Sequence, residues 1–288
     1  MLGTDRGLKL NDHGLSLIRQ MIYDQYGIFV PDNKGYLLAN RVSARMDKLG
    51  VAEVSTYHAM LKSGGAVSVE MNLLINDLTI NETCFFRNPA QIAVLQDTVI
   101  PRIVETKAKI GFTRLKVWSA GCSSGEEPYT LAMVLLEKQL SLLKGWQVEI
   151  AGTDISDDAL AGAATATYDQ YAMRNVADYF KKKYFAPVRE TEGVRYRVKD
   201  DVKALVRFSK LNLANDIKMT FMKGMDVISC CNVLIYFDSN SKKKVIQHFY
   251  NNLNRGGYLF LGHAESLTGV DDRFKLVHFP GGIAYCKE

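Results

Sequence analysis

The stretch WSAGCSSGEEPY at residues 118–129 decides the fold of this chain. It follows a short apolar run, residues 115–118, that has the composition of a strand, and it leads into residues 127–143, which have the pattern of a helix. Glycines between a strand and a helix allow the backbone to turn sharply and to approach a ligand closely. The stretch therefore predicts a strand–turn–helix unit of the kind that can hold a ligand at the start of its helix.

The charges within this turn narrow the choice of ligand. The glycine spacing of Gly121 and Gly125 differs from the G-x-G-x-x-G of dinucleotide enzymes, and the Lys-Ser/Thr of a phosphate-binding loop is missing. Glu126 and Glu127 would repel a phosphate but suit a cationic ligand such as S-adenosylmethionine, which carries an ammonium and a sulfonium. The same acids would also favour the N-terminal end of an ordinary helix that binds nothing. The turn alone leaves both interpretations open.

Strands and helices alternate outward from this turn. Further strand candidates are residues 148–153, 206–209, 225–230, 258–262, 274–279 and 283–286, with a helix at about 241–253. This alternation indicates an α/β domain with a mostly parallel sheet, and Pro280-Gly281-Gly282 suggests that the last two strands form a hairpin. Residues 178–205 interrupt the pattern with alternating apolar and basic residues, which we interpret as an antiparallel β flap inserted at the sheet edge.

The N-terminal part has a helical pattern instead. Leu15, Ile18, Ile22 and Tyr26 recur at helical spacing before Gly27, and residues 36–49 and 53–62 form two further helix candidates. Asn88-Pro89 then has the signature of a helix start and opens a helix that reaches about Lys107. We therefore expect a helical domain over residues 1–85, a linker helix over 86–110 and an α/β domain over 111–288.

Composition gives expectations for disulfides, bound metals and cellular location. The 288 residues carry a net charge of +5, and the five cysteines include no C-x-x-C, which favours buried free thiols over disulfides or a zinc site. The histidines are scattered, so we expect no bound metal. No apolar run reaches the roughly 18 residues of a membrane span, and the N-terminus lacks the apolar core of a signal peptide. We expect a cytosolic protein without membrane insertion.

Asp154 stands directly after the second predicted strand. Ligands of open α/β sheets lie at the carboxyl ends of the strands, where an acid can accept hydrogen bonds from ribose hydroxyls. Asp154 is therefore a candidate ribose ligand. The alternative is that Asp154 or Ser156 caps a helix that starts near Asp157.

Four motifs in register carry a resemblance to a known family. They are NETCFFR at residues 81–87, WSAGCSSGEEPY at 118–129, NVLIYF at 232–237 and GHAESL at 262–267. Together they resemble the CheR family of bacterial chemoreceptor glutamate methyltransferases, and the resemblance covers almost the whole chain. It implies a Rossmann-like class I methyltransferase sheet with a small antiparallel β flap, preceded by an all-α N-terminal domain. It also implies S-adenosylmethionine as cofactor and S-adenosylhomocysteine as product.

The resemblance implies roles for individual residues. With Gly121 of the turn, the expected cofactor-binding residues are Asn81, Thr83, Arg87, Gly121, Glu127, Asp154, Asn212, Leu213, Asn232 and Val233. Among these, Glu127 rather than Glu126 is expected to hold the methionine amino group, and Asp154 the ribose. Arg87 and Tyr236 are expected at the reacting centre as catalytic residues. Cys231 departs from the family, which commonly has Arg there, and Ala264 stands where Ser is common.

A basic stripe on the second predicted helix is a candidate docking surface. Lys34, Arg41, Arg45 and Lys48 share one face of this helix. From the residues alone, a solvated helix face is the simpler interpretation. The resemblance favours docking of the helical cytoplasmic domains of chemoreceptors through Arg41, Arg45 and Lys48. The flap is similar to the region that some family members use to bind a receptor's C-terminal peptide, and the sequence leaves open whether this chain does so.

Two other functions compete with glutamate methylation. One is methyl transfer to another acceptor such as RNA, which the positive charge permits. The run CNVLIYF, however, lacks the Asn/Asp-Pro-Pro-aromatic box typical of enzymes that methylate amino groups of nucleic acids, so we expect no nucleic-acid substrate. The other is a binding module that senses S-adenosylmethionine, and the presence of Arg87 and Tyr236 argues for an enzyme instead.

Overall fold

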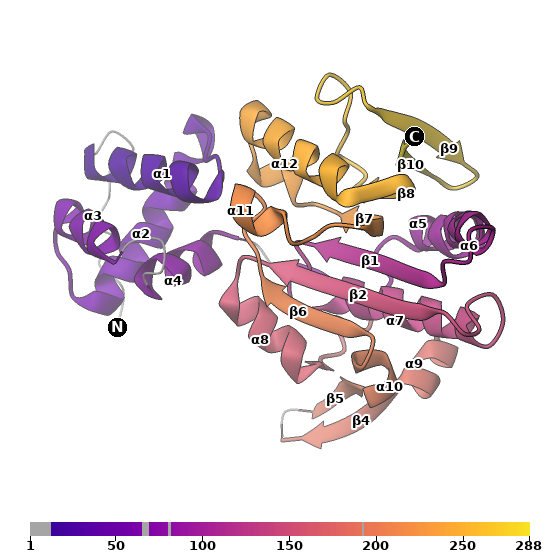
Figure 1. The fold of residues 1–288 in the computed structure, drawn as a ribbon. Helices are drawn as coiled ribbons and strands as arrows, with labels where there is room; N and C mark the ends of the chain where they lie inside the picture. Colours follow the sequence, from indigo (N-terminus) through magenta and orange to yellow (C-terminus); the bar gives the residue numbers. More distant parts are fainter. Residues whose placement is uncertain (1–12, 65–68, 80–81, 192) are drawn as a thin grey trace.

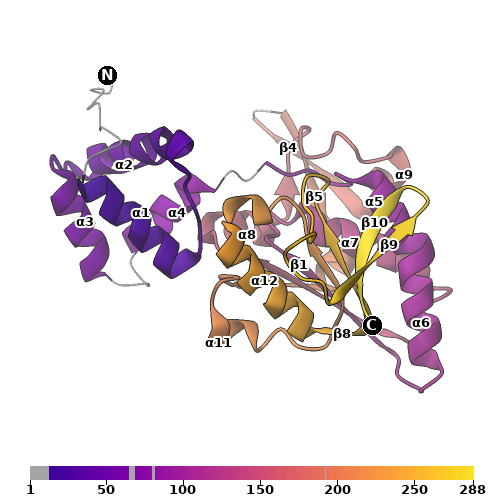
Figure 2. The ribbon, with the colours of Figure 1, turned by 90° about the horizontal axis from the view of Figure 1, so that it is seen from above.

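The computed structural model describes residues 13–64, 69–79, 82–191 and 193–288. A group of helices at the N-terminal end lies beside a sheet domain, on the side toward which the arrow of β1 points (Figures 1 and 2). The elements of the N-terminal group are α1 (His13–Tyr26), η1 (Asp32–Lys34), α2 (Gly35–Leu49), α3 (Val54–Ser63) and α4 (Val69–Leu78). The first three predicted helices are confirmed within two residues where bounds were given, whereas α4 was not predicted.

Helix α4 changes the meaning of the basic stripe on α2. Arg45 is only 7% exposed, and its Nε and Nη2 donate to the two carboxylate oxygens of Glu70 on α4 at 2.9 and 2.7 Å. Tyr57 of α3 donates to the same carboxylate at 2.8 Å. A guanidinium held in this way cannot present its charge to a partner. The structure therefore corrects the docking assignment of Arg45. This residue is buried and links α2 to α4 through its hydrogen bonds with Glu70.

The sheet is mostly parallel, as predicted for a Rossmann-like fold. In the described part of the chain, seven strands run in the order β6-β2-β1-β7-β8-β10-β9. Their bounds are β1 Arg114–Ala120, β2 Gln147–Asp154, β6 Val206–Lys210, β7 Met225–Cys230, β8 Leu253–Leu261, β9 Phe274–Phe279 and β10 Gly282–Lys287. The first five strands in this order are parallel, and β10 is antiparallel to both of its neighbours. The predicted α/β fold and terminal hairpin are confirmed.

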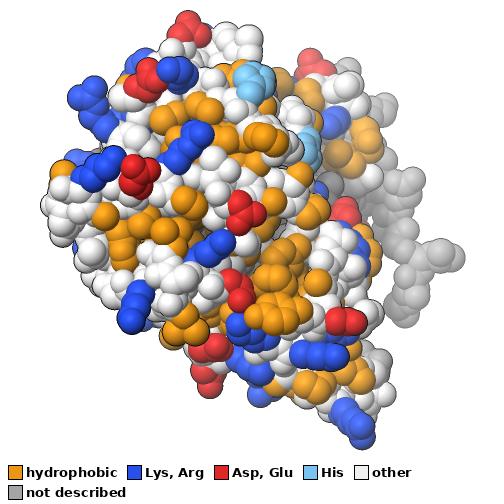
Figure 3. Space-filling model, turned by 90° about the vertical axis from the view of Figure 1, so that its right-hand side faces the viewer, with side chains coloured by type: hydrophobic (Ala, Val, Ile, Leu, Met, Phe, Trp, Pro, Cys, Tyr) orange, Lys and Arg blue, Asp and Glu red, His pale blue; other side chains and the backbone are white. Residues whose placement is uncertain are grey.

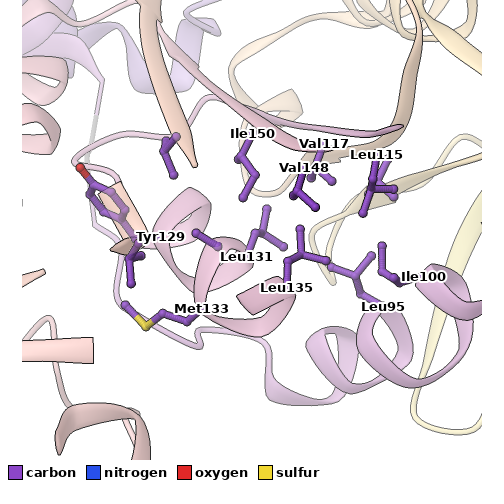
Figure 4. Close-up of a cluster of buried hydrophobic side chains, with 14 of the residues drawn as sticks. Leu95, Ile100, Leu115, Val117, Tyr129, Leu131, Met133, Leu135, Val148 and Ile150 are labelled. Atoms are coloured by element: carbon purple, nitrogen blue, oxygen red, sulfur yellow. The ribbon is translucent and has the colours of Figure 1, made fainter. Parts of the chain in front are cut away.

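The alternation of side chains along β1 explains the layers. Leu115 and Val117 face one side and pack with α7 and the helix before β1, as the side chains in Figure 4 show. Trp118 and Ala120 belong to the core cluster that includes α12. Each fully buried aliphatic side chain contributes about 1.5–3 kcal/mol relative to exposure, so both faces of β1 hold the sheet between helices.

Helices pack on the sheet and connect its strands. They are α5 (Pro89–Val94), the π-turn η3 (Leu95–Val99), α6 (Ile100–Ala108), α7 (Glu126–Gln139), α8 (Asp157–Thr165), α11 (Asp216–Met219), the short η4 (Leu234–Tyr236) and α12 (Ser239–Asn252). The first three run without a break, as predicted for the linker helix. Pro101 has no N–H to donate to the carbonyl of Asp97, which accounts for the local widening into a π-turn. No helix in the described ranges combines the length and apolarity needed to cross a membrane.

The predicted flap is a small sheet of its own. Its order is β3 (Thr167–Tyr168), β5 (Gly193–Val198), β4 (Phe185–Glu190), all antiparallel. The strand assignment is wrong for Lys181 to Lys183, which lie on α9 (Asp178–Tyr184), and α10 (Asp200–Lys203) follows β5.

The face of the molecule seen in Figure 3 interleaves apolar, basic and acidic side chains without one charge dominating.

Candidate active site

A cavity of about 290 Å³ lies at the carboxyl ends of β1, β2 and β7. The strand order reverses between β1 and β7, which is where open α/β sheets bind ligands. Ten predicted site residues line this cavity: Thr83, Arg87, Gly121, Glu127, Asp154, Asn212, Leu213, Asn232, Val233 and Tyr236. Asn81 lies outside the described residues. The structure thus brings together segments that are up to about 150 positions apart in the sequence.

Glycine is required at the start of the turn. Gly121 has a φ of 77°, and a Cβ at this position would lie 2.3 Å from Cγ2 of Val233. The N–H groups of Gly121 and Cys122 both donate to the carbonyl oxygen of Thr153, at 2.8 and 2.9 Å. The turn is therefore held against the end of β2, with its backbone close to the segment that follows β7.

The two acids of the turn point to different surroundings. Glu127 lines the cavity, and the Ser119 hydroxyl donates to its Oε1 at 2.7 Å. Glu126 is 4% exposed and accepts from the Ser124 hydroxyl at 2.8 Å, outside the lining. Burial raises the pKa of both carboxyls. The geometry accordingly favours Glu127 over Glu126 as the group that would meet a ligand ammonium.

The raised pKa of Glu127 predicts how ligand affinity depends on pH. Burial raises this pKa above the usual value of about 4.3, so the charge that attracts an ammonium is lost on acidification before an ordinary glutamate would lose it. The Kd for S-adenosylmethionine should therefore rise as the pH falls through the raised pKa. Glu127→Gln should bind weakly at every pH, and calorimetric titrations across pH for both proteins would show it. A wild-type pH profile that persists in Glu127→Gln would contradict this role.

Asp154 is not the residue that caps the helix that follows it. Ser156 caps α8, since its hydroxyl accepts from the N–H of Ala159 at 3.1 Å. Asp154 accepts from the N–H of Ser123 at 2.7 Å and from that of Ser156 at 3.0 Å. Burial raises its pKa, and these backbone donors oppose the shift. The N–H of Ile155 also interacts with this carboxylate, whose two oxygens can accept about four hydrogen bonds, so Asp154 lines the cavity with capacity for a further hydroxyl donor.

The segment before α5 is anchored by one aromatic residue. Phe85 is fully buried and packs edge-to-face against Tyr168 and Phe185. Phe86 has a φ of 52°, a conformation that costs about 1–3 kcal/mol, and its N–H donates to the Thr130 hydroxyl at 3.1 Å. This bend brings Arg87 to the cavity, where its Nη1 donates to the Glu82 carbonyl at 3.0 Å.

Glu265 holds the segment after β7, and sequence reasoning gave it no role. It is 8% exposed, and its carboxylate accepts from the N–H groups of Asn232, Leu234 and Gly262 at 2.7 to 2.8 Å. Asn232 has a φ of 61°, so this contact stabilises an uncommon conformation next to the cavity. The signal was present in the GHAESL motif, in which Glu265 is the single acid.

Cys231, where the resemblance predicts an Arg, lines the cavity. Its thiol donates to Oε1 of Gln91 at 3.4 Å and lies 3.6 Å from the Ser229 hydroxyl. Burial, and then the negative charge of Glu127, raise the pKa of this thiol well above its ordinary value. The cavity therefore has a neutral, protonated thiol near Glu127.

S-adenosylmethionine fits the polar groups that the cavity presents. Glu127 would face its ammonium, and Asp154 would accept from its ribose. The buried hydroxyl oxygen of Ser123, a lining residue, has no hydrogen-bond partner among the described residues and is available to a ligand. Within the same described ranges, no three His, Cys, Asp or Glu residues form a group that could hold a metal ion. The sheet order and this site define a Rossmann-like S-adenosylmethionine-dependent methyltransferase.

Comparison with known proteins gives the family. The family model of the CheR methyltransferase all-alpha domain matches residues 13–79, and that of the CheR methyltransferase SAM-binding domain matches residues 81–283. The chain belongs to the CheR methyltransferase family. It is 34% identical over 278 residues to chemotaxis protein methyltransferase 2 of Vibrio cholerae, covering 96% of this chain and 94% of that protein. It is 33% identical to the chemotaxis protein methyltransferase of Borreliella burgdorferi, covering 88% of each.

Proposed function

We propose that this protein transfers the methyl group of S-adenosylmethionine to glutamate side chains of chemoreceptors, forming glutamate methyl esters in the cytoplasm. The observation that carries the proposal is that Arg87 and Tyr236 line the same cavity as Glu127 and Asp154. One cavity thus combines groups suited to the cofactor with two groups suited to an acceptor. The names of the relatives, chemotaxis protein methyltransferases, support a chemoreceptor as the substrate.

A carboxylate acceptor suits the groups that line this cavity. When bound, S-adenosylmethionine supplies an electrophilic methyl group on its sulfonium. A glutamate is already ionised at neutral pH, so the protein has no proton to remove and contributes position and electrostatics. The guanidinium of Arg87 can orient a carboxylate through two parallel hydrogen bonds. The ring and hydroxyl of Tyr236 can hold the acceptor in line with the methyl group.

Substrate docking is part of the proposal. The helical domain (residues 1–85) would meet the receptor through the exposed Arg41 and Lys48 of α2, and the linker helix (86–110) joins it to the methyltransferase domain (111–288). The acidic helices of a receptor's cytoplasmic domain complement this charge. Within the β flap (178–205), β4 is an edge strand that can accept an added strand from a receptor's C-terminal peptide.

Charge reversal on α2 tests the docking surface. Arg41→Glu combined with Lys48→Glu should raise the KM for a receptor cytoplasmic fragment by about 10-fold, because like charges would then meet across the interface. The affinity for S-adenosylmethionine should not change, since neither residue lines the cavity. Lys62→Glu on α3 is the matched control and should leave KM unchanged. An unchanged KM in the double variant would show that α2 is an ordinary solvated face.

Methyl transfer to defined acceptors tests the function. The protein is incubated with methyl-labelled S-adenosylmethionine and either the cytoplasmic fragment of a chemoreceptor from the same organism or RNA from that organism. We expect label on the receptor fragment. Label on RNA alone would contradict the proposal, and cofactor binding without transfer to any receptor of the organism would favour the sensing module instead.

A further inference from the structure

Tyr26 ends α1 with a buried hydroxyl that none of the described residues satisfies. The side chain is part of the core of the N-terminal helices, and the residue is only 6% exposed. Its hydroxyl oxygen has no hydrogen-bond partner among the residues that the structure describes. A buried hydroxyl without a partner costs about 1–3 kcal/mol. A phenylalanine would fill the same space without this cost, so the hydroxyl calls for an explanation.

The position of Tyr26 explains why this residue has a hydroxyl, because Tyr26 lines the active-site cavity. The adjacent carbonyl of Gln25 accepts from Nδ2 of Asn212 at 2.8 Å, which fixes the end of α1 beside one of the expected cofactor-binding residues. Ile155, which follows Asp154, packs against the same helical core and also lines the cavity. Tyr26 is therefore at the end of the cavity where Asp154 and Asn212 lie.

The protonation state of Tyr26 suits a donor. Burial raises the pKa of its phenol, and the negative charge of Asp157 raises it further. The hydroxyl therefore keeps its proton at neutral pH and can donate to an uncharged acceptor. The adenosine part of the cofactor offers such acceptors in its ring nitrogens and ribose oxygens.

We propose that Tyr26 is a cofactor-binding residue that the N-terminal helices contribute to the site, with its hydroxyl donating a hydrogen bond to the adenosine part of S-adenosylmethionine. This inference rests on the proposed use of S-adenosylmethionine by this cavity, and it is independent of the identity of the methyl acceptor. It assigns the helical domain a second role in addition to receptor docking.

The contacts around Tyr26 extend the consequence to the domain arrangement. The hydroxyl of Tyr23 donates to Asp238 at 3.1 Å, and the N–H of Phe29 donates to the carbonyl of Tyr236 at 2.8 Å. The end of α1 and the residues after it are thus attached to the proposed catalytic segment. Because the cofactor would add one more bond at Tyr26, its binding should increase the protection of amides in residues 26–29 from hydrogen exchange.

Tyr26→Phe in the full chain tests the inference with two readouts. The Kd for S-adenosylhomocysteine, measured by calorimetry, should rise by about 10-fold, which corresponds to one lost hydrogen bond of about 1.4 kcal/mol. The midpoint of unfolding without ligand should stay the same or rise, since the variant removes an unsatisfied group. The matched control is Tyr57→Phe, whose hydroxyl donates to Glu70 at 2.8 Å. This control should lower stability without ligand and leave the Kd unchanged.

Adenosine as a second probe locates the contact. Tyr26→Phe should weaken binding of adenosine as well as of S-adenosylhomocysteine, whereas Glu127→Gln should weaken only the latter, because adenosine has no ammonium. An unchanged Kd for both probes in Tyr26→Phe would overturn the inference and show that water satisfies the hydroxyl. Loss of stability without ligand would overturn it in favour of a structural role. Failure of the wild-type protein to bind either probe would instead overturn the proposed cofactor.

Discussion

Asp154→Ala should raise the Kd for S-adenosylmethionine by about 100-fold or more. Hydrogen bonds to a charged group are worth about 1.5–3 kcal/mol each, and a tenfold change in Kd corresponds to about 1.4 kcal/mol. The substitution would remove the acceptor that faces the ribose. It would also release the N–H of Ser123, which Asp154 holds at 2.7 Å, and so loosen the glycine turn. Calorimetric titration with S-adenosylmethionine measures both effects together.

Two further variants calibrate this loss of affinity. Asp154→Asn keeps one acceptor oxygen and should bind with an intermediate affinity. Asp158→Ala removes a neighbouring exposed acid from the same stretch of chain, and its Kd should equal that of the wild type. An Asp154→Ala protein that binds as tightly as Asp158→Ala would show that Asp154 only shapes the turn.

Arg87→Ala should lower turnover at saturating cofactor by about 100-fold or more, the typical loss when a donor to the transition state is removed. The proposed role of Arg87 is to orient the acceptor carboxylate, and a lysine cannot reproduce its planar pair of donors. Arg87→Lys should therefore recover only part of the activity. Initial rates of methyl incorporation into a receptor fragment would measure the change.

Tyr236→Phe belongs to the same test, because Tyr236 is the other proposed member of the reacting centre. It should also lower turnover by about 100-fold. Tyr179→Phe is its control, since Tyr179 is 55% exposed and donates to Glu137, and neither residue lines the cavity. Full turnover in Arg87→Ala or Tyr236→Phe would remove that residue from the reacting centre.

The sequence predicted most of the sheet domain because its signals are local. The apolar strands that alternate with helices, the glycine turn and the hairpin at Pro280 each depend on a few neighbouring residues. In the structure these elements begin and end within a few residues of the predicted bounds. The widest difference is β8, which begins at Leu253 rather than at residue 258. The segment between these positions contains Gly256 and Gly257, which weaken a strand signal.

The features that the sequence could not predict depend on contacts that only the folded structure shows. Arg45 has the same helical position whether or not α4 packs on α2, so its burial against Glu70 could not be predicted from spacing. Tyr26 has the spacing of a core residue and is one, and only the structure shows that its hydroxyl lacks a partner beside the cavity. The sequence left open whether Asp154 is a ribose ligand or whether Asp154 or Ser156 caps α8, and the hydrogen bonds in the structure assign the cap to Ser156.

The chemical stability of the transferred methyl group tests the central claim most directly. A receptor fragment labelled by this protein from methyl-labelled S-adenosylmethionine is treated with mild base, and the volatile fraction is counted. Glutamyl methyl esters release methanol under these conditions, whereas methylated lysines and nucleic-acid bases do not. We predict that nearly all of the label leaves as methanol and that Arg87→Ala produces almost none. Label that stays on the fragment after base treatment would contradict transfer to a glutamate carboxylate.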